Sequence, residues 1–129
     1  MTVYVDDMRA RLGQHILCHM IADTEAELHA MAERIGTEPR RYHRDHYDIP
    51  LPQRSLALAA GARAISQRQL ACMVWLRRRG HAMGRPETAE RRYRRLRDAR
   101  DGGAPAARTA LRAGATTLAG DCAGAPERP

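Results

Sequence analysis

Phenylalanine and lysine are both absent from the 129 residues, and aromatic residues make up only 4% of the chain. A hydrophobic core must therefore be built from Leu, Ile, Val, Met and Ala, with Trp75 and four tyrosines as its only large rings. Large rings bury the most apolar area per residue, so their scarcity predicts modest stability. The length allows one folded domain, because a second core would be too small to survive alone.

Signals for export and for membrane insertion are also missing. No apolar run approaches the roughly 18 residues that a membrane-spanning helix needs, and residues 1–7 lack the basic start and apolar stretch of a secretory signal. The three cysteines, Cys18, Cys72 and Cys122, form neither a close pair nor a ligand-like cluster, a pattern typical of reduced thiols. These absences predict a cytoplasmic protein with no membrane partner.

Positive charge is abundant and is concentrated in one segment. Basic and acidic residues cancel over residues 1–76 and again over 101–129, whereas residues 77–100 hold ten arginines and three acids, which gives the whole net charge of +7. Clustered guanidinium groups bind phosphates by charge and forked hydrogen bonds, but on a solvated helix they only keep a small protein soluble. Both interpretations stay open for the candidate nucleic-acid contacts Arg91, Arg92, Arg94 and Arg95.

Hydrophobic periodicity and capping residues predict an α/β fold: a small three-stranded sheet with flanking helices. We expect strands at 2–5, 16–22 and 62–65, and helices at 25–35, 52–60, 67–79 and 86–100. Thr24 and Glu27 form a capping box that opens the first helix. The two helices between the second and third strands allow a right-handed parallel crossover. The connection between the first two strands is short for such a crossover, so this pair is parallel or antiparallel.

The remaining segments complete the predicted organisation. Residues 1–80 form the α/β domain, residues 81–100 an Arg-rich helical extension, and residues 101–129 a disordered tail of low-complexity composition. In the extension, a thin apolar stripe is expected to lie against the domain while Arg91, Arg92 and Arg95 stay exposed. The stripe consists of Ala89, Tyr93 and Leu96.

A set of carboxylates and imidazoles marks a candidate site. Its members are Asp6, Asp7, His19, Asp23, His46 and Asp48. Such side chains bind divalent cations, which polarise phosphoryl oxygens and activate water. Asp23 follows the second strand, and the polar loop 37–50 can fold over that end, where open α/β sheets usually carry their sites. We predict catalytic residues His19, Asp23, His46 and Asp48, with His46, Asp48 and Asp23 as metal ligands and Arg54 near enough to meet an anion.

The same residues also have a purely structural interpretation. Asp23 before Thr24 favours the helix N-terminus electrostatically, His19 can be a satisfied strand histidine, and Asp48 can simply turn the loop. No spacing matches a metal signature such as His-Glu-x-x-His. In an antiparallel arrangement, Asp6 and Asp23 leave opposite ends of the sheet and cannot share an ion, and we then expect Asp6 to be the one left out.

Several short motifs together carry a family resemblance. They are Val3-Tyr4-Val5-Asp6-Asp7, His19-Met20-Ile21-Ala22-Asp23, Glu27-Leu28-His29-Ala30 and His46-Tyr47-Asp48. In this order they resemble the DUF4031 family of small bacterial and phage proteins of unknown function, over about residues 2–66. The resemblance implies a shared fold and no known activity. The chain departs from the family pattern at Pro52-Gln53-Arg54, where Ser-Lys-Arg is expected and only Arg54 carries over, and at Tyr42-His43.

Three functional hypotheses follow from these features. The first is a metal-assisted phosphoester hydrolase that acts on a nucleotide or nucleic acid, with a divalent metal as its cofactor. The second is a non-enzymatic accessory protein whose Arg-rich helix contacts nucleic acid or an acidic partner. The third is a protein-interaction module that docks through the apolar stripe. Convergence of the four predicted catalytic residues in one site is required by the first hypothesis alone.

Overall fold

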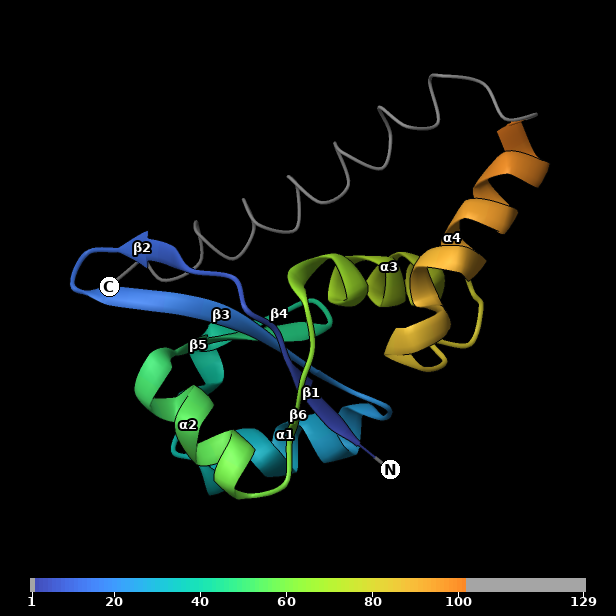
Figure 1. Cartoon of the computed structure of the whole chain (residues 1–129). Coiled ribbons are helices and arrows are strands. Elements are labelled where there is room, and N and C mark those ends of the chain that lie inside the picture. The colour runs from blue at the N-terminus through green and yellow to red at the C-terminus, as the bar shows by residue number, and fades with distance from the viewer. Residues whose placement is uncertain (1, 102–129) are drawn as a thin grey trace.

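The computed structural model describes residues 2–101, and over this range the chain forms one mixed β-sheet with helices on both faces (Figure 1). The sheet order is β4-β5-β3-β1-β6, and β2 pairs with β3 outside this path. The strands are β1 (Val3–Val5), β2 (Ala10–Leu12), β3 (His15–Ala22), β4 (Tyr42–His43), β5 (His46–Pro50) and β6 (Arg63–Ala64). The helices are α1 (Glu25–Arg34), α2 (Leu51–Ala59), α3 (Gln67–Arg78) and α4 (Pro86–Asp101), with a short 3-10 helix η1 (Pro39–Arg41).

The predicted α/β class is confirmed, but the sheet has six strands rather than three. β2 lies in the predicted polar connection and folds back on β3 through Gly13, whose φ of 59° suits glycine in a tight turn. β4 and β5 lie in the predicted loop 37–50 and form a hairpin. These short strands are polar or contain proline. They form because a neighbouring strand offers a pairing partner, β3 for β2 and β5, and β5 for β4, rather than through their own propensity.

The central strand pair is antiparallel. β1 pairs with β3 in a register that places Val3 opposite Ala22 and Val5 opposite Met20. β6 pairs in parallel with β1 and therefore runs antiparallel to β3, so the predicted parallel crossover from the second to the third strand is wrong. The register brings Asp6, the residue that follows β1, next to His19. The main-chain N–H of Asp6 donates to the main-chain oxygen of His19 at 3.1 Å.

The two faces of the sheet carry different helices. Side chains of alternating residues on a strand point to opposite faces, and Val5, Cys18 and Met20 join the apolar cluster that includes residues of α1 and α2. Tyr4 and Ile21, from the same strands, join a second cluster with residues of α3 and α4. Figure 1 shows α1 and α2 together on one side of the sheet and α3 on the other, with α4 beyond α3.

The helix boundaries follow local signals in the sequence. The Thr24 hydroxyl accepts the Glu27 N–H at the start of α1, and Ser66 and Gln69 form a complete capping box at the start of α3. All four predicted helices are present, with ends shifted by a residue or two. None of the helices that the structure describes is both long and apolar enough to cross a membrane.

The Arg-rich helix α4 packs on α3 through its apolar stripe. Ala89 and Tyr93 are fully buried and Leu96 is partly buried in the cluster shared with α3, and the Tyr93 ring meets Trp75 edge-on at 4.7 Å. The predicted exposure of Arg92 is wrong, because its guanidinium donates to the main-chain oxygens of residues 82 and 83. The predicted disordered tail, apart from Asp101 at the end of α4, lies outside the described residues.

Candidate metal centre

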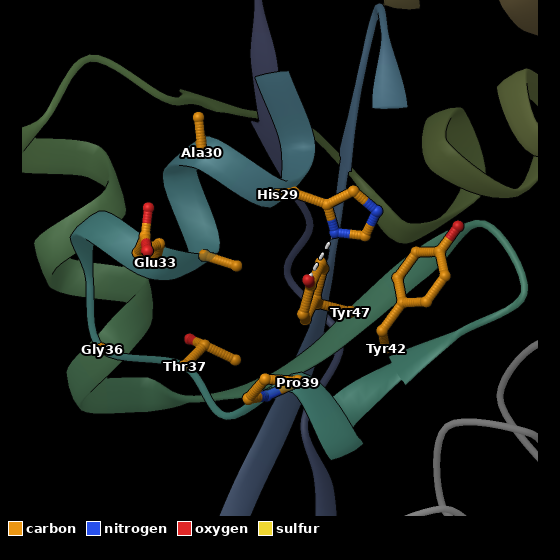
Figure 2. A pocket seen from close by; sticks show the side chains of 9 residues that line it. His29, Ala30, Glu33, Gly36, Thr37, Pro39, Tyr42 and Tyr47 are labelled. Atoms are coloured by element: carbon orange, nitrogen blue, oxygen red, sulfur yellow. Dashed lines mark hydrogen bonds between the residues drawn. The ribbon is translucent and has the colours of Figure 1, made fainter. Parts of the chain in front are cut away.

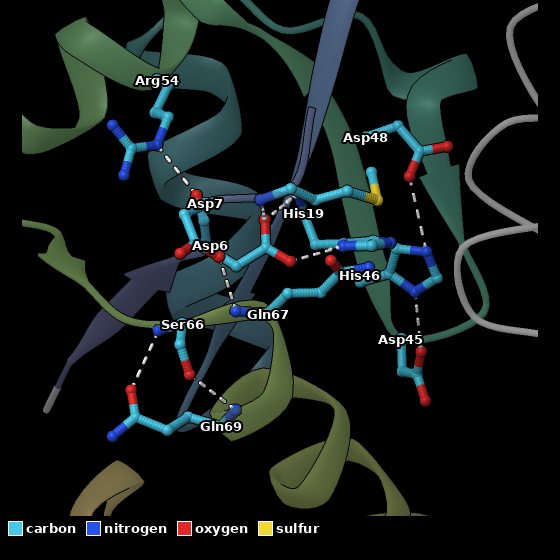
Figure 3. A network of polar contacts seen from close by, with 11 residues as sticks. Asp6, Asp7, His19, Asp45, His46, Asp48, Arg54, Ser66, Gln67 and Gln69 are labelled. Atoms are coloured by element: carbon cyan, nitrogen blue, oxygen red, sulfur yellow. Dashed lines mark hydrogen bonds and ion pairs between the residues drawn. The ribbon is translucent and has the colours of Figure 1, made fainter. Parts of the chain in front are cut away.

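Three buried side chains converge on the α3 face of the sheet: His19 from β3, and His46 and Asp48 from β5 (Figure 3). β3 and β5 are antiparallel neighbours, and their register places His19 opposite Asp48. His46 and Asp48 are two residues apart on one strand, so they share a face. Each of the three offers a ligand atom within 4.8 Å of the others, and all three residues are 0% exposed.

The His19 ring is held by the Asp6 carboxylate. Oδ2 of Asp6 lies 2.6 Å from Nδ1 of His19, and Oδ1 accepts the main-chain N–H of His19 at 2.8 Å. Because a carboxylate accepts here, we assign the ring proton to Nδ1. The Nε2 atom is then the unprotonated one, and it is buried with no hydrogen-bond partner among the described residues. A carboxylate behind a histidine in this way fixes the tautomer that a metal ligand needs.

The His46 ring is held in a similar manner by Asp45. Nδ1 of His46 lies 3.0 Å from Oδ1 of Asp45, and Arg78 of α3 grips the same carboxylate with Nε and Nη2 at 2.8 and 3.0 Å. Burial opposes a charged imidazole, but the Asp45 and Asp48 carboxylates outweigh it and raise the pKa of His46. Burial likewise opposes ionisation of Asp45, yet His46 and Arg78 hold the pKa of that carboxyl well below its usual range.

The Asp48 carboxylate has the least support of the three groups. Both of its oxygens are buried, and neither accepts a hydrogen bond from the described residues. The Nε2 atom of His46 lies 3.5 Å from Oδ1, which is close enough for charge attraction but too long for a good hydrogen bond. A buried carboxylate without donors costs several kcal/mol, and a cation would offset that cost.

The donor set fits a divalent transition metal. Two imidazole nitrogens and one carboxylate oxygen suit Zn²⁺, Fe²⁺ or Mn²⁺ better than an all-oxygen set would. Three protein ligands also leave coordination positions open, as in catalytic zinc sites. With Asp6 and Asp45 behind the two histidines, the chain supplies both the ligands and the groups that orient them.

Asp23 lies apart from this cluster, so the prediction that it converges with His19, His46 and Asp48 is wrong. It follows the far end of β3, where Oδ2 accepts the main-chain N–H of Thr2 at 2.9 Å and Oδ1 accepts the Tyr4 hydroxyl at 3.2 Å. The two acids do leave opposite ends of the antiparallel pair, but Asp6 is the one that meets His19. The cluster also lies on the face of the sheet and not at the strand ends, because the predicted loop contains β5.

Two residues that orient the cluster lay outside the predicted site. Asp6 belongs to the candidate set in the sequence but not to the predicted catalytic residues, and the β1–β3 register is what brings it to His19. Asp45 had no signal of its own, since its role depends on the β4–β5 turn and on Arg78. The available signal was the His46-x-Asp48 spacing, which in a strand places both side chains on one face.

Other predicted site residues stabilise neighbouring backbone. Nε of Arg54 donates to the main-chain oxygen of Asp6 at 2.9 Å, and in Figure 3 its side chain lies on the opposite side of Asp6 from His46. Asp7 accepts the main-chain N–H of Gln67 at 2.8 Å, at the start of α3. Contact between Arg54 and an anion stays a prediction.

The thiol beside His19 on β3 belongs to the other face of the sheet. Cys18 is fully buried in the apolar cluster that includes α1 and α2 residues. Burial raises its pKa to about 12, with the Asp6 charge adding to the effect. A thiol with this pKa stays protonated near neutral pH, which makes it a poor nucleophile, and its place on the other face keeps it out of the His19 cluster.

Several arginines of the charged segment have partners within the chain. Arg77 donates to the main-chain oxygens of Ala22 and Asp23, both at 2.8 Å, next to the Arg78–Asp45 pair. Arg94 forms an ion pair with Glu90 on α4. The exposed arginines of α4 without an ion pair or hydrogen bond among the described residues include Arg91 and Arg95.

A comparison with protein families finds one match. A family model described as a protein of unknown function (DUF4031) matches residues 3–77, which is more than half of the chain. The chain belongs to the DUF4031 family. No curated protein and no solved structure matches it. The DUF4031 match contains all three candidate ligands together with Asp6 and Asp45, and it ends one residue before Arg78. The Arg-rich helix α4 lies beyond the DUF4031 match.

Proposed function

We propose that this protein binds one divalent transition-metal ion through Nε2 of His19, Nε2 of His46 and the Asp48 carboxylate, and that it uses the ion to hydrolyse a phosphoester of a nucleotide or nucleic acid. The observation that supports this most directly is the Asp48 carboxylate, buried beside two imidazoles without a hydrogen-bond donor among the described residues. A buried polar group without a partner is rare in a native fold, and a bound ion is one way to satisfy it.

The chemistry follows from the three-ligand arrangement. A bound ion would polarise a phosphoryl oxygen and lower the pKa of a water molecule to about 7. The residues of this chain would hold the ion: Asp48 neutralises part of its charge, while Asp6 and Asp45 keep each imidazole turned with Nε2 toward it. Carboxylates behind ligating histidines also raise their basicity, which strengthens binding.

Metal binding is tested first, by calorimetric titration of the metal-free protein with Zn²⁺, Mn²⁺ and, without oxygen, Fe²⁺. We expect one ion per chain for at least one of these metals. Asp48→Asn keeps the shape of the side chain and should abolish stoichiometric binding. Asp23→Asn is the matched control, because it neutralises an aspartate that directly follows β3, the strand of His19, and lies outside the cluster. Equal affinity in wild type and Asp48→Asn would contradict the site.

Hydrolysis is tested separately on bis(4-nitrophenyl) phosphate and on single-stranded oligonucleotides, with the metal-loaded protein. We expect turnover that disappears on chelation and in Asp48→Asn but persists in Asp23→Asn. Stoichiometric metal binding with no turnover on either phosphoester would overturn the hydrolase while leaving the metal site in place. The two halves of the proposal can thus fail independently.

A second function has a separate observation in its favour. We also propose that α4 makes non-specific contact with nucleic acid, because Arg91 and Arg95 are exposed and have no ion-pair partner among the described residues. Contacts of this kind depend on charge and carry no base information. The competing interaction module is not favoured, since the apolar stripe of α4 already packs on α3 of the same chain.

Substitution of arginines on α4 tests this contact. Replacing Arg91 and Arg95 by glutamine keeps helix propensity and should lower the salt concentration that elutes the protein from a heparin column. Replacing Arg9 and Arg11, at or beside β2 at the far end of the sheet, by glutamine removes a similar charge and is the control. Equal loss of retention in both variants would show that net charge, and not α4, is responsible.

A further inference from the structure

A groove lies on the sheet face opposite the candidate metal centre, between α1 and the β4–β5 hairpin. Its volume is about 690 Å³. Figure 2 shows His29, Tyr47 and Tyr42 on one side of it, Ala30 and Glu33 of α1 on the other, and the segment that includes Thr37 and Pro39 below. Tyr47 connects the two regions, because it lies between His46 and Asp48 on β5 but points to the other face.

Three rings form one continuous wall of this groove. The ring centroid of His29 lies 4.7 Å from that of Tyr42 and 5.6 Å from that of Tyr47, and the two tyrosine centroids are 5.2 Å apart. Rings this close touch one another, so no ligand can enter between them. A ligand would instead lie against the outer surface of the wall, where aromatic faces attract apolar groups and cations.

The polar atoms of this wall are arranged as acceptors. The Tyr47 hydroxyl lies 2.6 Å from Nδ1 of His29, and we assign it as the donor because the Glu25 carboxylate on the other side of the ring favours the ring proton on Nε2. The Nε2–H of His29 then faces Glu25 at 3.3 Å. The Tyr42 hydroxyl donates to the main-chain oxygen of Arg44 at 2.9 Å. Both phenol protons are used within the protein, and both oxygens keep lone pairs for a ligand.

The carboxylate that lines the groove is also a hydrogen-bond acceptor. Glu33 contributes a carboxylate, and of the described residues that line the groove none is arginine, in a chain with 22 basic residues. The Thr37 hydroxyl also lines the groove; its residue is 8% exposed, and the oxygen has no hydrogen-bond partner among the described residues. The groove thus combines an apolar wall, a carboxylate and several acceptors, and its lining offers no positive charge to hold a phosphate.

We propose that this groove binds a small organic cation, an amidinium or guanidinium group on a flat or apolar stem, with the stem against the Tyr42 ring and the N–H groups directed to Glu33. Planar forked donors match a carboxylate in two-point hydrogen bonding, and the ring wall adds a cation–π contribution. This site is separate from the candidate metal centre and does not depend on it. It gives the protein a ligand of opposite charge to the phosphoester proposed for the other face.

Three probes of one shape and different charge test the proposal. Benzamidine, benzamide and benzoate are cationic, neutral and anionic on the same flat ring. We expect two-dimensional NMR titration of the full chain to give a dissociation constant for benzamidine about tenfold lower than for benzamide, with shifted signals confined to α1 and the β4–β5 hairpin. Benzoate should not bind. Equal affinity of all three, or preference for benzoate, would overturn the proposal.

Two substitutions locate the binding. Glu33→Gln should reduce the preference for benzamidine over benzamide to less than about threefold, and Tyr42→Leu should weaken both probes. Glu38→Gln is the matched control for Glu33→Gln, because Glu38 is an exposed carboxylate of the same region that pairs with Arg40 and does not line the groove. Melting temperatures of the variants establish that the fold is intact. Equal effects of Glu33→Gln and Glu38→Gln would contradict the site.

The natural source of the cation is distinguished by a second set of probes. Agmatine represents a free metabolite, N-acetyl-arginine amide represents the side chain of a polypeptide, and N-acetyl-citrulline amide is the neutral comparison. Tighter binding of either cation than of the citrulline compound supports the proposal and identifies the source. If neither cation binds more tightly than the citrulline compound, the groove is not a guanidinium site.

Discussion

On β5, neighbouring side chains enter two different environments. Tyr47 and Ile49 point to the face covered by α1 and α2 and join its apolar cluster, whereas His46 and Asp48 point to the face covered by α3. All four are almost completely buried. The difference between them is whether their polar atoms have partners: the Tyr47 hydroxyl is hydrogen-bonded, while both Asp48 oxygens lack donors among the described residues. On this strand, unsatisfied hydrogen-bonding capacity, rather than burial, distinguishes the candidate ligand Asp48 from its neighbours.

The energetic roles of the two faces differ accordingly. Apolar burial stabilises the fold by about 25 cal/mol per Å², and the α1–α2 face contributes in this way. Burial of carboxylates and imidazoles generally gives no net stability compared with apolar residues of the same size. A chain with so few aromatic residues therefore carries its polar cluster at the expense of stability, which is the pattern expected of a site kept for binding.

The largest expected effect is the rise in melting temperature when a metal ion binds to the face that carries His46 and Asp48. At a free metal concentration about 100-fold above the dissociation constant, binding stabilises the native state by about 2.7 kcal/mol, which corresponds to a rise of roughly 10 °C in the melting temperature for a domain of this size. Differential scanning fluorimetry should show this rise for the wild type and for Asp23→Asn. His19→Ala and Asp48→Asn should show none, and a full shift in either would remove that residue from the site.

The next effect concerns the residues behind the ligands. Arg78→Gln frees the Asp45 carboxylate and loosens His46, and loss of such orienting contacts weakens metal binding by about 10- to 100-fold. Arg77→Gln is the control, since Arg77 donates to the end of β3 and not to Asp45. Isothermal titration of both variants measures the difference. An Arg77→Gln variant that weakens binding as much as Arg78→Gln would indicate a general loss of α3 docking.

A smaller effect is expected from the apolar face of the same strand. Ile49→Val removes one buried methylene and should lower the free energy of unfolding by about 1 kcal/mol in urea denaturation. The metal-induced rise in melting temperature should stay unchanged, because the side chain points away from the cluster. If Ile49→Val also reduced that rise, the two faces would be mechanically coupled through β5.

The smallest expected effect is that the buried cysteines of the native protein do not react with a thiol reagent. Burial raises the pKa of the Cys18 thiol to about 12 and that of Cys72 to about 11. With Cys122 replaced by serine, the native protein should show almost no reaction with a thiol reagent at pH 8, and both thiols should react after unfolding. Addition of Zn²⁺ should not change this result. Fast labelling of Cys18 in the native state would mean that its face of the sheet is open.

The sequence predicted the helices well because their signals are local. Thr24 with Glu27, and Ser66 with Gln69, are capping pairs that can be identified without knowing the rest of the fold. β5 was missed because His46–Pro50 has weak strand propensity and forms a strand only by pairing with β3. Three of the four predicted catalytic residues do converge, since the His46-x-Asp48 spacing suits one face of a strand.

Local sequence signals could not decide whether Asp6 or Asp23 lies beside His19. Both are acids at the ends of predicted strands, and only the register of β1 against β3 decides which one meets His19. Register depends on contacts between segments distant in sequence, so no local pattern encodes it. The same holds for Asp45, whose role requires Arg78 from a helix that begins after β6.

The long sequence distance between Asp45 and Arg78 has a consequence for folding during synthesis. A nascent chain that ends at β6 already contains all three candidate ligands, but it lacks the α3 arginine that orients His46. Domains acquire distant contacts only after the later segment is available. A metal ion bound at this centre would therefore meet the fully oriented His46 ring only after α3 has docked on the completed sheet.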